Sequence, residues 1–474
     1  ALAAASTAFA KLRGAPRSQI AEFLDLFARK IEERANELVE IANQETALPP
    51  SPRLADVELP RTTGQLRQAA AAARTGNWTQ PVIDSANNIR SCYGPIGPVT
   101  VFGPNTFPFA FGSASGGDFA AAIAAGNPVI AKANSSHPGT TKLFAECASA
   151  AIEETGMPEA LVQLIYRTEH EVGERLVSDP RIGATGYTGS RGAGLALKRA
   201  ADASGKPIYL ELSSVNPVVF LPGVVAAKAE ELAEEFVGSC LMGTGQFCTN
   251  PGLILAIEGE ATDTFIECIR KRFDEAPVGT LLSSSVERSL HRSHEILTGA
   301  GVDVSCGTGA GNGNGYCVAN TFLRTSGTAF LADPETMQTE AFGNTSLMVV
   351  ASSLEESAEI LGSLEGNLTG SIYSAEDGKD DKAYDLLAPV LRGKVGRLLN
   401  DKMPTGVAVS PAMNHGGPYP ATGHAGFTAV GIPAAILRFA TLHCYDNVRP
   451  GRLPKILRDD YEGTAQRLID GVWT

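Results

Sequence analysis

One cysteine of this sequence, Cys248, lies in a setting that suits a nucleophile. It sits in the glycine-containing segment 243–252, GTGQFCTNPG, directly after an apolar helical pattern over 230–242. Backbone amides that converge on a sulfur in such a turn would lower the pKa of a thiol from about 8.5. They would also hold negative charge on a substrate oxygen. A small buried cysteine in a tight turn explains this segment equally well, so the motif alone leaves both interpretations open.

A thiol nucleophile needs a base, and Glu211 is the best placed carboxylate. It ends the apolar run 208–212, where an acid is costly unless it is paired or functional. A structural acid satisfied by backbone amides is the alternative. No histidine lies near Cys248 in sequence, so the pattern does not favour a Cys/His hydrolase, although a distant histidine could still approach the thiol in space.

The remaining cysteines and the seven histidines show no metal-ligand spacing and no CxxC pair. They are scattered along the chain as Cys92, Cys147, Cys240, Cys268, Cys306, Cys317 and Cys444. This pattern is typical of reduced thiols in a cytoplasmic protein, and it predicts no metal site.

Charge and hydropathy exclude two further classes. The formal net charge of -13 disfavours a nucleic-acid partner, which needs clustered Lys and Arg. No apolar run reaches the roughly 18 residues of a membrane span, and the weakly apolar start lacks a basic leader region. We therefore expect a soluble chain of two or three domains.

Alternating apolar and helical segments predict an α/β fold with a mainly parallel, doubly wound sheet. The expected strands are 99–102, 129–132, 161–165, 184–187, 208–212 and 218–221, and the expected helices between them are 110–125, 140–155, 170–178 and 192–203. Two further helices are expected over 18–46 and 65–74, and a hairpin or arm over 78–90. The glycine-rich run 307–315 predicts a surface hairpin, because no helix pattern follows it to form a nucleotide loop.

Seven motifs together resemble the aldehyde dehydrogenase superfamily over roughly the whole chain. They are GPNTFP at 103–108, AKANSSHPGT at 131–140, YTGS at 187–190, ELSSVNP at 211–217, GQFC at 245–248, EAFG at 340–343 and PTGV at 404–407. The resemblance implies a Rossmann-like cofactor domain over 1–75 and 96–213 with a return segment at about 412–442. It implies a catalytic domain over 214–411, oligomerisation arms at 76–95 and 443–474, and a homodimer or homotetramer.

Within the superfamily, GQFCTNPG, SGGDFA at 115–120 and HGGPYPAT at 415–422 are similar to two groups. These are the α-ketoglutaric semialdehyde dehydrogenases and the bacterial NADP-dependent fatty aldehyde dehydrogenases. A carboxylate-bearing semialdehyde is the expected substrate and a fatty aldehyde the alternative. A CoA-acylating relative is disfavoured because such enzymes usually lack the Glu211 carboxylate. A catalytically silent relative is disfavoured because both Cys248 and Glu211 are present.

The resemblance assigns roles by position. Cys248 attacks the aldehyde, and Glu211 activates the water that hydrolyses the resulting thioester. The implied cofactor contacts are Lys132 on the adenosine ribose, Gly189 and Ser190 with Gly194 at the pyrophosphate, Glu340 on the nicotinamide ribose and Phe342 packed near it. The spacing of Gly189, Gly192 and Gly194 only approximates GxGxxG.

Two positions depart from the family pattern. Ser135 replaces the glutamate that accepts from the ribose 2′-hydroxyl of NAD, so we expect NADP as cofactor, with NAD also possible. The family also places an asparagine directly before Phe-Pro, where this chain has Thr106 and carries Asn105 one residue earlier. We expect Asn105 to donate to the oxyanion, with the Thr106 hydroxyl or the Cys248 amide alone as alternatives.

Overall fold

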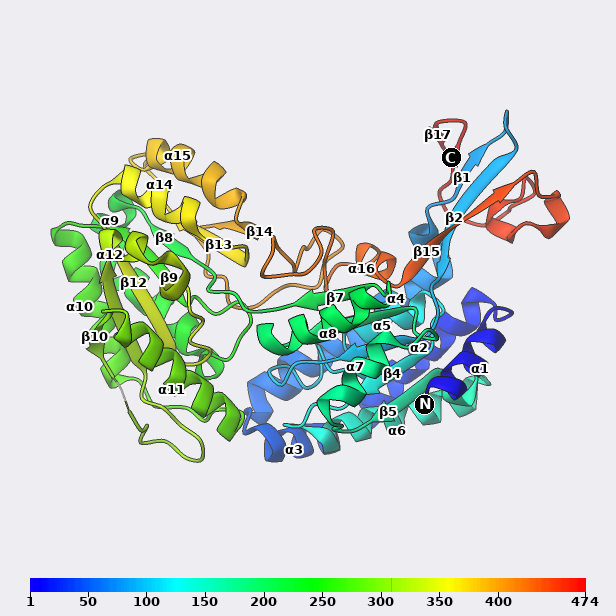
Figure 1. The fold of residues 1–474 in the computed structure, drawn as a ribbon, viewed down its shortest axis with the longest axis horizontal. Helices are drawn as coiled ribbons and strands as arrows, with labels where there is room; N and C mark the ends of the chain where they lie inside the picture. The colour runs from blue at the N-terminus through cyan, green and yellow to red at the C-terminus, as the bar shows by residue number, and fades with distance from the viewer. Residues whose placement is uncertain (308) are drawn as a thin grey trace. The chain divides into compact units, whose positions relative to one another are not determined.

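The computed structural model describes residues 1–307 and 309–474, which form two compact units. Unit 1 contains Ala1–Leu210, Val409–Met413 and Thr428–Thr474, and unit 2 contains Glu211–Ala408 and Asn414–Phe427. The colour in Figure 1 runs from blue at the N-terminus to red at the C-terminus, so the main segment of unit 2, Glu211–Ala408, is drawn from green to orange. The boundary at Glu211 assigns both predicted reactive residues, Cys248 and Glu211, to unit 2.

Unit 1 is built on a five-stranded sheet in the order β5-β4-β3-β6-β7. Its strands are β3 (Val99–Phe102), β4 (Val129–Lys132), β5 (Val162–Ile165), β6 (Ala184–Thr188) and β7 (Ile208–Glu211). The pairs β3–β4, β3–β6 and β4–β5 are parallel. The chain leaves β3 toward β4 and later returns to its other side with β6, which creates a switch point at the carboxyl edge. The predicted α/β class and parallel sheet are confirmed.

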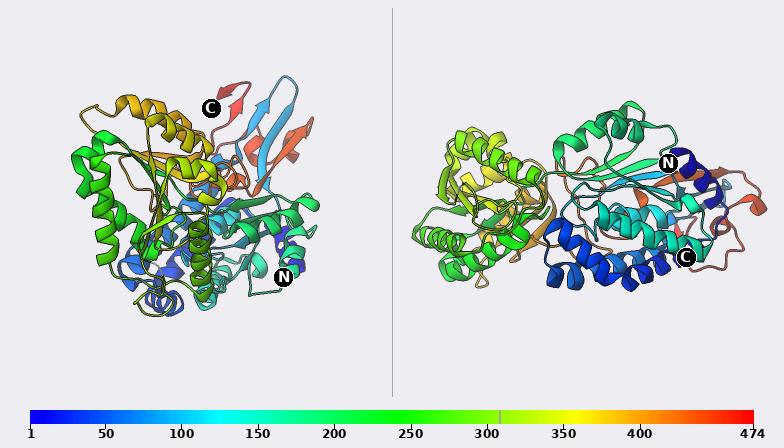
Figure 2. Two further views of the ribbon diagram at one scale, coloured as in Figure 1. Left: turned by 60° about the vertical axis from the view of Figure 1, so that its left-hand side comes forward. Right: turned by 90° about the horizontal axis from the view of Figure 1, so that it is seen from below.

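Helices cover both faces of this sheet, as the right-hand view of Figure 2 shows. On one face α7 (His170–Ser178) packs on α8 (Arg191–Ala203). On the other face α2 packs on α4 and α6, and α4 packs on α5. The bounds in unit 1 are α1 (Leu2–Leu12), α2 (Arg17–Glu33), α3 (Ala35–Thr46), α4 (Leu59–Thr75), α5 (Gly117–Ala124), α6 (Pro138–Thr155) and α16 (Ala434–Leu437).

Two predicted helices were wrong in extent. The single helix over 18–46 breaks at Arg34, which leaves helical geometry with φ −110° and ψ 22° and bonds to Glu37 and Glu146. The helix over 110–125 begins only at Gly117, because the preceding residues turn around a buried carboxylate. Glu58 accepts hydrogen bonds from the amides of Phe109 and Ala110 at 3.0 and 3.2 Å, which holds that segment in turns.

A second, smaller sheet of unit 1 has the order β15-β2-β1-β16-β17. Its strands are β1 (Val82–Asp84), β2 (Ile89–Pro95), β15 (Ala440–Asp446), β16 (Leu468–Ile469) and β17 (Val472–Trp473). Strands β1 and β2 form an antiparallel hairpin, as the sequence predicts for this region. Figure 1 shows β1, β2 and β15 projecting from the helices of unit 1, and we call this sheet the arm.

Unit 2 contains a seven-stranded sheet in the order β10-β11-β12-β9-β8-β13-β14, parallel except for the edge pair β10–β11. Its strands are β8 (Val218–Phe220), β9 (Leu253–Ile257), β10 (Asp303–Cys306), β11 (Thr321–Ser326), β12 (Thr345–Ala351), β13 (Asn367–Tyr373) and β14 (Val395–Asn400). Its helices are α9 (Pro222–Leu241), α10 (Glu260–Glu275), α11 (Ser284–Gly299), α12 (Gly327–Ala332), α13 (Pro334–Met337), α14 (Leu354–Ser363) and α15 (Asp381–Arg392). Phenylalanines form much of the buried core, among them Phe220, Phe236, Phe265, Phe273 and Phe322.

The glycine-rich run 307–315 is a hairpin where the structure describes it. Ala310 and Val318 form an antiparallel bridge, and the amide of Ala319 donates to the carbonyl of Gly309 at 3.2 Å. No helix in the described ranges 1–307 and 309–474 is long and apolar enough to cross a membrane.

Candidate active site

The turn that carries Cys248 follows helix α9 and depends on glycine. Gly243, Thr244 and Gly245 all have positive φ angles, of 57°, 59° and 66°. A Cβ on Gly245 would lie 2.0 Å from the carbonyl oxygen of Gly343, so only glycine fits between these two segments. The helix therefore ends in a tight turn that packs on the segment 340–343 and leaves Cys248 partly exposed.

Unit 2 brings a histidine to this cysteine. Nε2 of His415 lies 3.4 Å from Sγ of Cys248 and 3.0 Å from Oε1 of Glu211. His415 and Glu211 are both 1% exposed, so the partly exposed thiol is the open side of the cluster. The two predicted reactive residues thus lie together, joined by a third residue that is 167 positions beyond Cys248 in sequence.

Close backbone packing fixes the position of His415. Glu211 forms an antiparallel bridge with Thr422, and the amide of Leu212 donates to the carbonyl of Ala421 at 2.8 Å. A Cβ on Gly417 would lie 2.2 Å from the carbonyl oxygen of Asn367, so the chain after His415 needs glycine to approach β13. The motif HGGPYPAT is therefore a structural unit that places the imidazole beside the carboxylate.

Two buried asparagines, Asn216 and Asn367, support the Cys248 loop by hydrogen bonds. Nδ2 of Asn216 donates to the carbonyls of Cys248 and Asn250 at 2.9 Å each. Oδ1 of Asn367 in turn accepts from the amides of Val215 and Asn216 at 2.9 and 3.1 Å. Asn216 has a left-handed φ of 48°, a conformation that asparagine tolerates better than most residues. The sequence motif ELSSVNP contains Asn216, but its contact with the cysteine loop was not predicted.

A cation also acts on the thiol. Burial lowers the pKa of Arg397, and the charge of Cys248 opposes that effect, so the two groups are electrostatically coupled. The guanidinium donates to the carbonyls of Pro404 and Gly406, and the amide of Gly406 donates to Oγ1 of Thr249 at 3.3 Å. Arg397 therefore supports the loop beside the cysteine and favours the thiolate by its charge.

The cluster can hold a thiolate and move a proton. Nε2 of His415 faces both the sulfur and the carboxylate oxygen, but it carries at most one proton. When Nε2 is protonated, it can donate to a thiolate, and the charge of an imidazolium attracts the carboxylate; when it is not protonated, it can accept the proton of the thiol. The arrangement suits a cysteine nucleophile whose proton passes to a buried imidazole–carboxylate pair.

The predicted nicotinamide-side residues of unit 2 lie near this turn. Oε1 of Glu340 accepts from the amide of Ser214 at 3.3 Å, and its carbonyl accepts from Ser293. Phe342 is partly buried and directly precedes Gly343, against which the cysteine turn packs. Their roles toward a cofactor stay predictions.

The other predicted cofactor residues lie at the carboxyl edge of the unit 1 sheet. Lys132 ends β4, and Ser135 is exposed in the loop that follows. Gly189 and Ser190 follow β6, and Gly194 lies in the first turn of α8, where its amide donates to the carbonyl of Ser190 at 3.0 Å. Burial and the charge of Arg167 lower the pKa of Lys132, so an anionic ligand would stabilise its ammonium group.

The loop with Asn105 and Thr106 is anchored by a buried ion pair that the sequence did not predict. Nη2 of Arg53 donates to the carbonyl of Thr106 at 2.7 Å and pairs with Glu58 at 2.8 Å. Glu58 is fully buried, and burial raises the pKa of its carboxyl. Asn105 is partly exposed whereas Thr106 is 5% exposed. The role of Asn105 as oxyanion donor stays a prediction.

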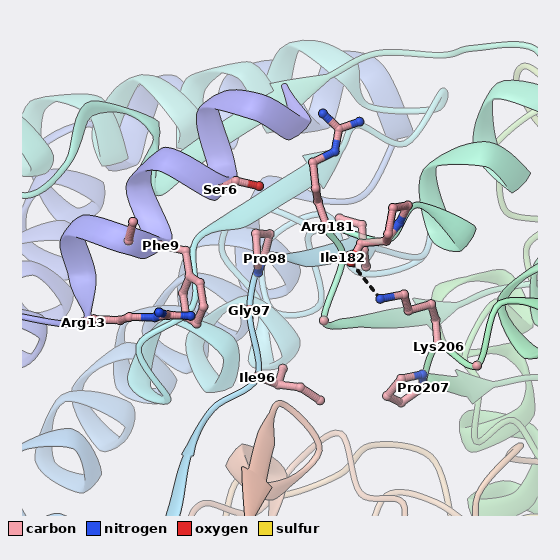
Figure 3. A pocket seen from close by; sticks show the side chains of 14 residues that line it. Ser6, Phe9, Arg13, Ile96, Gly97, Pro98, Arg181, Ile182, Lys206 and Pro207 are labelled. Carbon is pink, nitrogen blue, oxygen red and sulfur yellow. Dashed lines mark hydrogen bonds between the residues drawn. The ribbon is translucent and has the colours of Figure 1, made fainter. Parts of the chain in front are cut away.

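A pocket of about 450 Å³ lies at the edge of the five-stranded unit 1 sheet where its strands begin, opposite to the carboxyl edge. Figure 3 shows it lined by Ile96, Pro98, Ile182 and Pro207, which precede the strands, and by side chains of α1. Nζ of Lys206 points toward it and donates to the carbonyl of Pro180 at 2.9 Å. Because it faces the amino ends of the strands and contains none of the predicted site residues, we do not assign the chemistry to it.

The comparisons with known proteins all point to the same family. The profile of the aldehyde dehydrogenase family matches residues 1–411. Alpha-ketoglutaric semialdehyde dehydrogenase 2 of Azospirillum brasilense is 38% identical over 478 residues, covering 98% of this chain and 90% of the relative. Alpha-ketoglutaric semialdehyde dehydrogenase of Acinetobacter baylyi is 37% identical over 486 residues, covering 99% and 90%. A solved aldehyde dehydrogenase C mutant of Pseudomonas syringae, in complex with NAD+ and octanal, has a TM-score of 0.78 at 18% identity and covers 95% of this chain and 89% of that one.

Proposed function

Because the chain belongs to the aldehyde dehydrogenase family, we propose that it oxidises a carboxylate-bearing semialdehyde, such as α-ketoglutaric semialdehyde, to the carboxylic acid with NADP. The observation that carries this proposal is the contact of Cys248, His415 and Glu211 in unit 2. The names of the two relatives at 38% and 37% identity support the choice of substrate.

The thiol chemistry follows from the cluster. The Cys248 thiol loses its proton to the His415–Glu211 pair, and the thiolate attacks the aldehyde carbon to form a thiohemiacetal. A bound nicotinamide, held by Glu340 and Phe342, would supply the hydride acceptor for this carbon, and the oxidised carbon would then be a thioester on Sγ. The proton taken from the thiol leaves to solvent, and Glu211, with His415 beside it, then removes a proton from the water that attacks the thioester carbonyl. Collapse of the tetrahedral adduct releases the acid and returns the thiolate.

Backbone and side-chain donors stabilise the oxyanion of both tetrahedral adducts in this scheme. The amide of Cys248 is one donor, and Asn105 supplies the second. The Arg53–Glu58 pair supports this role, because it holds the carbonyl of Thr106 and fixes the loop that carries Asn105.

The carboxyl edge of the unit 1 sheet fits a phosphorylated dinucleotide. Ser190 caps helix α8 without a side-chain hydrogen bond to its first turn, and a Cβ on Gly192 would meet no heavy atom within 4 Å. The helix start thus presents backbone amides and space, which favours a pyrophosphate. Lys132 and Glu340 are the proposed contacts to the two riboses, and Phe342 packs near the nicotinamide.

Ser135 supports NADP as the preferred phosphate form. It is exposed in the loop after β4 and carries no charge that would repel a 2′-phosphate.

We assign the enzyme to the cytoplasm, because all eight cysteines are free thiols. Assembly into a homodimer or homotetramer through the arm completes the proposal.

The test is to follow reduced cofactor with α-ketoglutaric semialdehyde, succinate semialdehyde and octanal, each with NADP and NAD. We expect the highest kcat/KM with the first aldehyde and NADP, and no turnover by Cys248→Ala. Product analysis with and without CoA should give the free acid in both cases. An acyl-CoA product would show that CoA, and not water, accepts the acyl group of the thioester. If no aldehyde is oxidised although iodoacetamide labels Cys248, the proposed function is wrong.

A further inference from the structure

We propose that Cys248, His415 and Glu211 form a binding site for Zn²⁺, and that the bound ion reversibly blocks the nucleophilic sulfur. The binding part rests on the geometry of unit 2 alone. The inhibitory part rests on the proposed function. In the part of the chain that the structure describes, this is the one cluster of at least three His, Cys, Asp or Glu side chains positioned to hold a metal ion, and its ligand atoms all lie within 4.8 Å of one another.

The three ligand types match zinc chemistry. Thiolate, imidazole and carboxylate are the groups that bind Zn²⁺ in proteins, whereas Mg²⁺ and Ca²⁺ prefer sites made of oxygen alone. Three protein ligands leave a fourth tetrahedral position for water or a substrate oxygen. The cluster therefore selects a borderline-soft ion over the abundant hard cations.

The distances agree with a tetrahedral site. Ligand bonds of about 2.3 Å to sulfur and about 2.0–2.1 Å to nitrogen and oxygen imply S···N and N···O edges of about 3.5 and 3.3 Å. The structure has 3.4 Å between Sγ and Nε2 and 3.0 Å between Nε2 and Oε1. Movements on the order of a few tenths of an ångström would open these two edges to zinc geometry. The third edge, from Sγ to the carboxylate, lies within 4.8 Å and would close to about 3.5 Å on metal binding.

The carboxylate of Glu211 supplies an independent argument. Both of its oxygens are buried, and within residues 1–307 and 309–474 neither takes part in a hydrogen bond. Nε2 of His415 lies close to Oε1 of Glu211 without hydrogen-bond geometry. It places a positive charge beside the carboxylate only when the imidazole is protonated. A buried carboxylate with unused acceptor capacity is costly, and a cation in contact with it would offset that cost.

Metal binding would remove the nucleophilicity of the thiol without any change in oxidation state. Zn²⁺ takes the thiolate lone pair, the thiol proton leaves to solvent, and Nε2 coordinates through its lone pair while the imidazole proton lies on Nδ1. The sulfur can then no longer attack a carbonyl carbon. The positive charge of Arg397, which interacts electrostatically with Cys248, opposes a dication and lowers its affinity for the site.

Binding is tested on the full chain with Cd²⁺ as a spectroscopic probe for Zn²⁺. We expect one Cd²⁺ per chain with an ultraviolet thiolate-to-metal absorption band, displaced by Zn²⁺. Cys248→Ser should abolish the band. His415→Asn and Glu211→Gln should weaken binding about hundredfold, because even a partner that merely orients a ligand contributes 10–100-fold in affinity. Cys444→Ser, which removes the exposed thiol next to His443, is the matched control and should leave stoichiometry and affinity unchanged.

Two outcomes would overturn the site. One is a stoichiometry that falls with Cys444→Ser but not with Cys248→Ser. The other is full affinity in both His415→Asn and Glu211→Gln, provided that circular dichroism and thermal unfolding show that both variants are folded. Zn²⁺ should inhibit aldehyde oxidation in proportion to occupancy, and EDTA should restore it. Binding without any aldehyde oxidation would contradict the proposed function only, and oxidation unaffected by one bound Zn²⁺ would contradict the inhibitory part.

Discussion

At the reactive thiol, one imidazole nitrogen contacts two acidic groups. Nε2 of His415 is 3.4 Å from the sulfur of Cys248 and 3.0 Å from the carboxylate of Glu211. A direct Cys–Glu pair would have to pass the proton over a longer gap or through water. The imidazole instead links the two residues, so we propose that all three side chains take part in the acid–base chemistry.

Replacing this imidazole should therefore slow catalysis without destroying the fold. We expect His415→Asn to lower kcat about hundredfold, the lower end of typical losses for a positioned proton-transfer group. Alkylation of Cys248 by iodoacetamide at pH 7 should also slow, because the thiolate is the reactive form. His424→Asn, an exposed histidine in the same segment, is the control and should retain activity. Equal kcat and alkylation rates in His415→Asn and the parent would contradict the role.

Sequence reasoning identified two of these three residues. Cys248 and Glu211 each lie in a short motif whose local pattern indicates a turn or a strand end. His415 contacts the sulfur across 167 positions, and local patterns carry no information about such distances. Its motif HGGPYPAT carries a family resemblance but no local pattern that indicates contact with a thiol. The glycines after the histidine were the available signal, because close backbone approach is what they permit.

We also propose that one residue, Ser135, decides the choice between NADP and NAD. Ser135→Glu should raise KM for NADP about tenfold or more, because a carboxylate near the 2′-phosphate costs on the order of 1–4 kcal/mol at about 4 Å. KM for NAD should fall or stay unchanged, since the carboxylate can accept from the 2′-hydroxyl. Ser135→Gln has similar size without charge and serves as the control. A parallel change of KM for both cofactors would mean that Ser135 does not contact the ribose.

At the scale of elements, the Arg53–Glu58 pair organises the loop between β3 and α5. Glu58 is fully buried and accepts from the amides of Phe109 and Ala110, while Arg53 holds the carbonyl of Thr106. The segment before Gly117 contains Pro108, Gly112 and Gly116, which have low helix propensity, and the alanine run begins only after Gly117. Local propensity and the tertiary hydrogen bonds therefore both keep this loop in turns.

Breaking this pair should destabilise unit 1. Glu58→Gln leaves a cation partly buried without its partner, and such losses are about 3–5 kcal/mol. Glu32→Gln removes the exposed pair with Arg67 and should cost less than about 1 kcal/mol. Thermal unfolding compares the two variants, and equal changes in Tm would show that the Glu58 carboxylate has no special role.

The pH dependence of stability gives a second measure of Glu58. Burial raises the pKa of its carboxyl above the usual range near about 4.3. Between the unfolded and the folded pKa, the folded state holds this proton and the unfolded state does not, so this group makes stability fall as pH rises through that window. Glu58→Gln should remove that contribution, so the stability of the variant should fall less steeply as pH rises through this window. An unchanged slope would place the folded pKa within the ordinary range.

Element boundaries were predictable where a short apolar run is bounded by turn residues. Strands 99–102 and 129–132 and helix 170–178 were predicted with the bounds that the structure has. The break at Arg34 was not, because apolar residues keep helical spacing across it. Arg34, which leaves helical geometry there, forms a salt bridge with Glu146, 112 residues away, and only the folded chain brings the two together.

At the scale of the whole molecule, the arm presents an unpaired strand edge. Strand β15 lies at the end of its sheet, with β2 on one side. Seven-residue edge strands are rarely left exposed, since their backbone groups can pair with another chain. Leu442 on this strand is 56% exposed, and Val472 and Trp473 on β17, at the other end of the sheet, are 63% and 60% exposed. These features support the predicted assembly of identical chains through the arm.

A charge on that edge should separate the chains. Leu442→Asp places a carboxylate where the proposed interface buries an apolar side chain, and burying an unpaired charge costs several kcal/mol per interface. Light scattering coupled to size-exclusion chromatography should show the parent as a dimer or tetramer and Leu442→Asp shifted to a smaller species. Val57→Asp replaces an equally exposed apolar residue outside the arm, 52% exposed, and should leave the mass unchanged. A parent that runs as a monomer, or a mass that Leu442→Asp does not alter, would mean that strand β15 is not the contact between subunits.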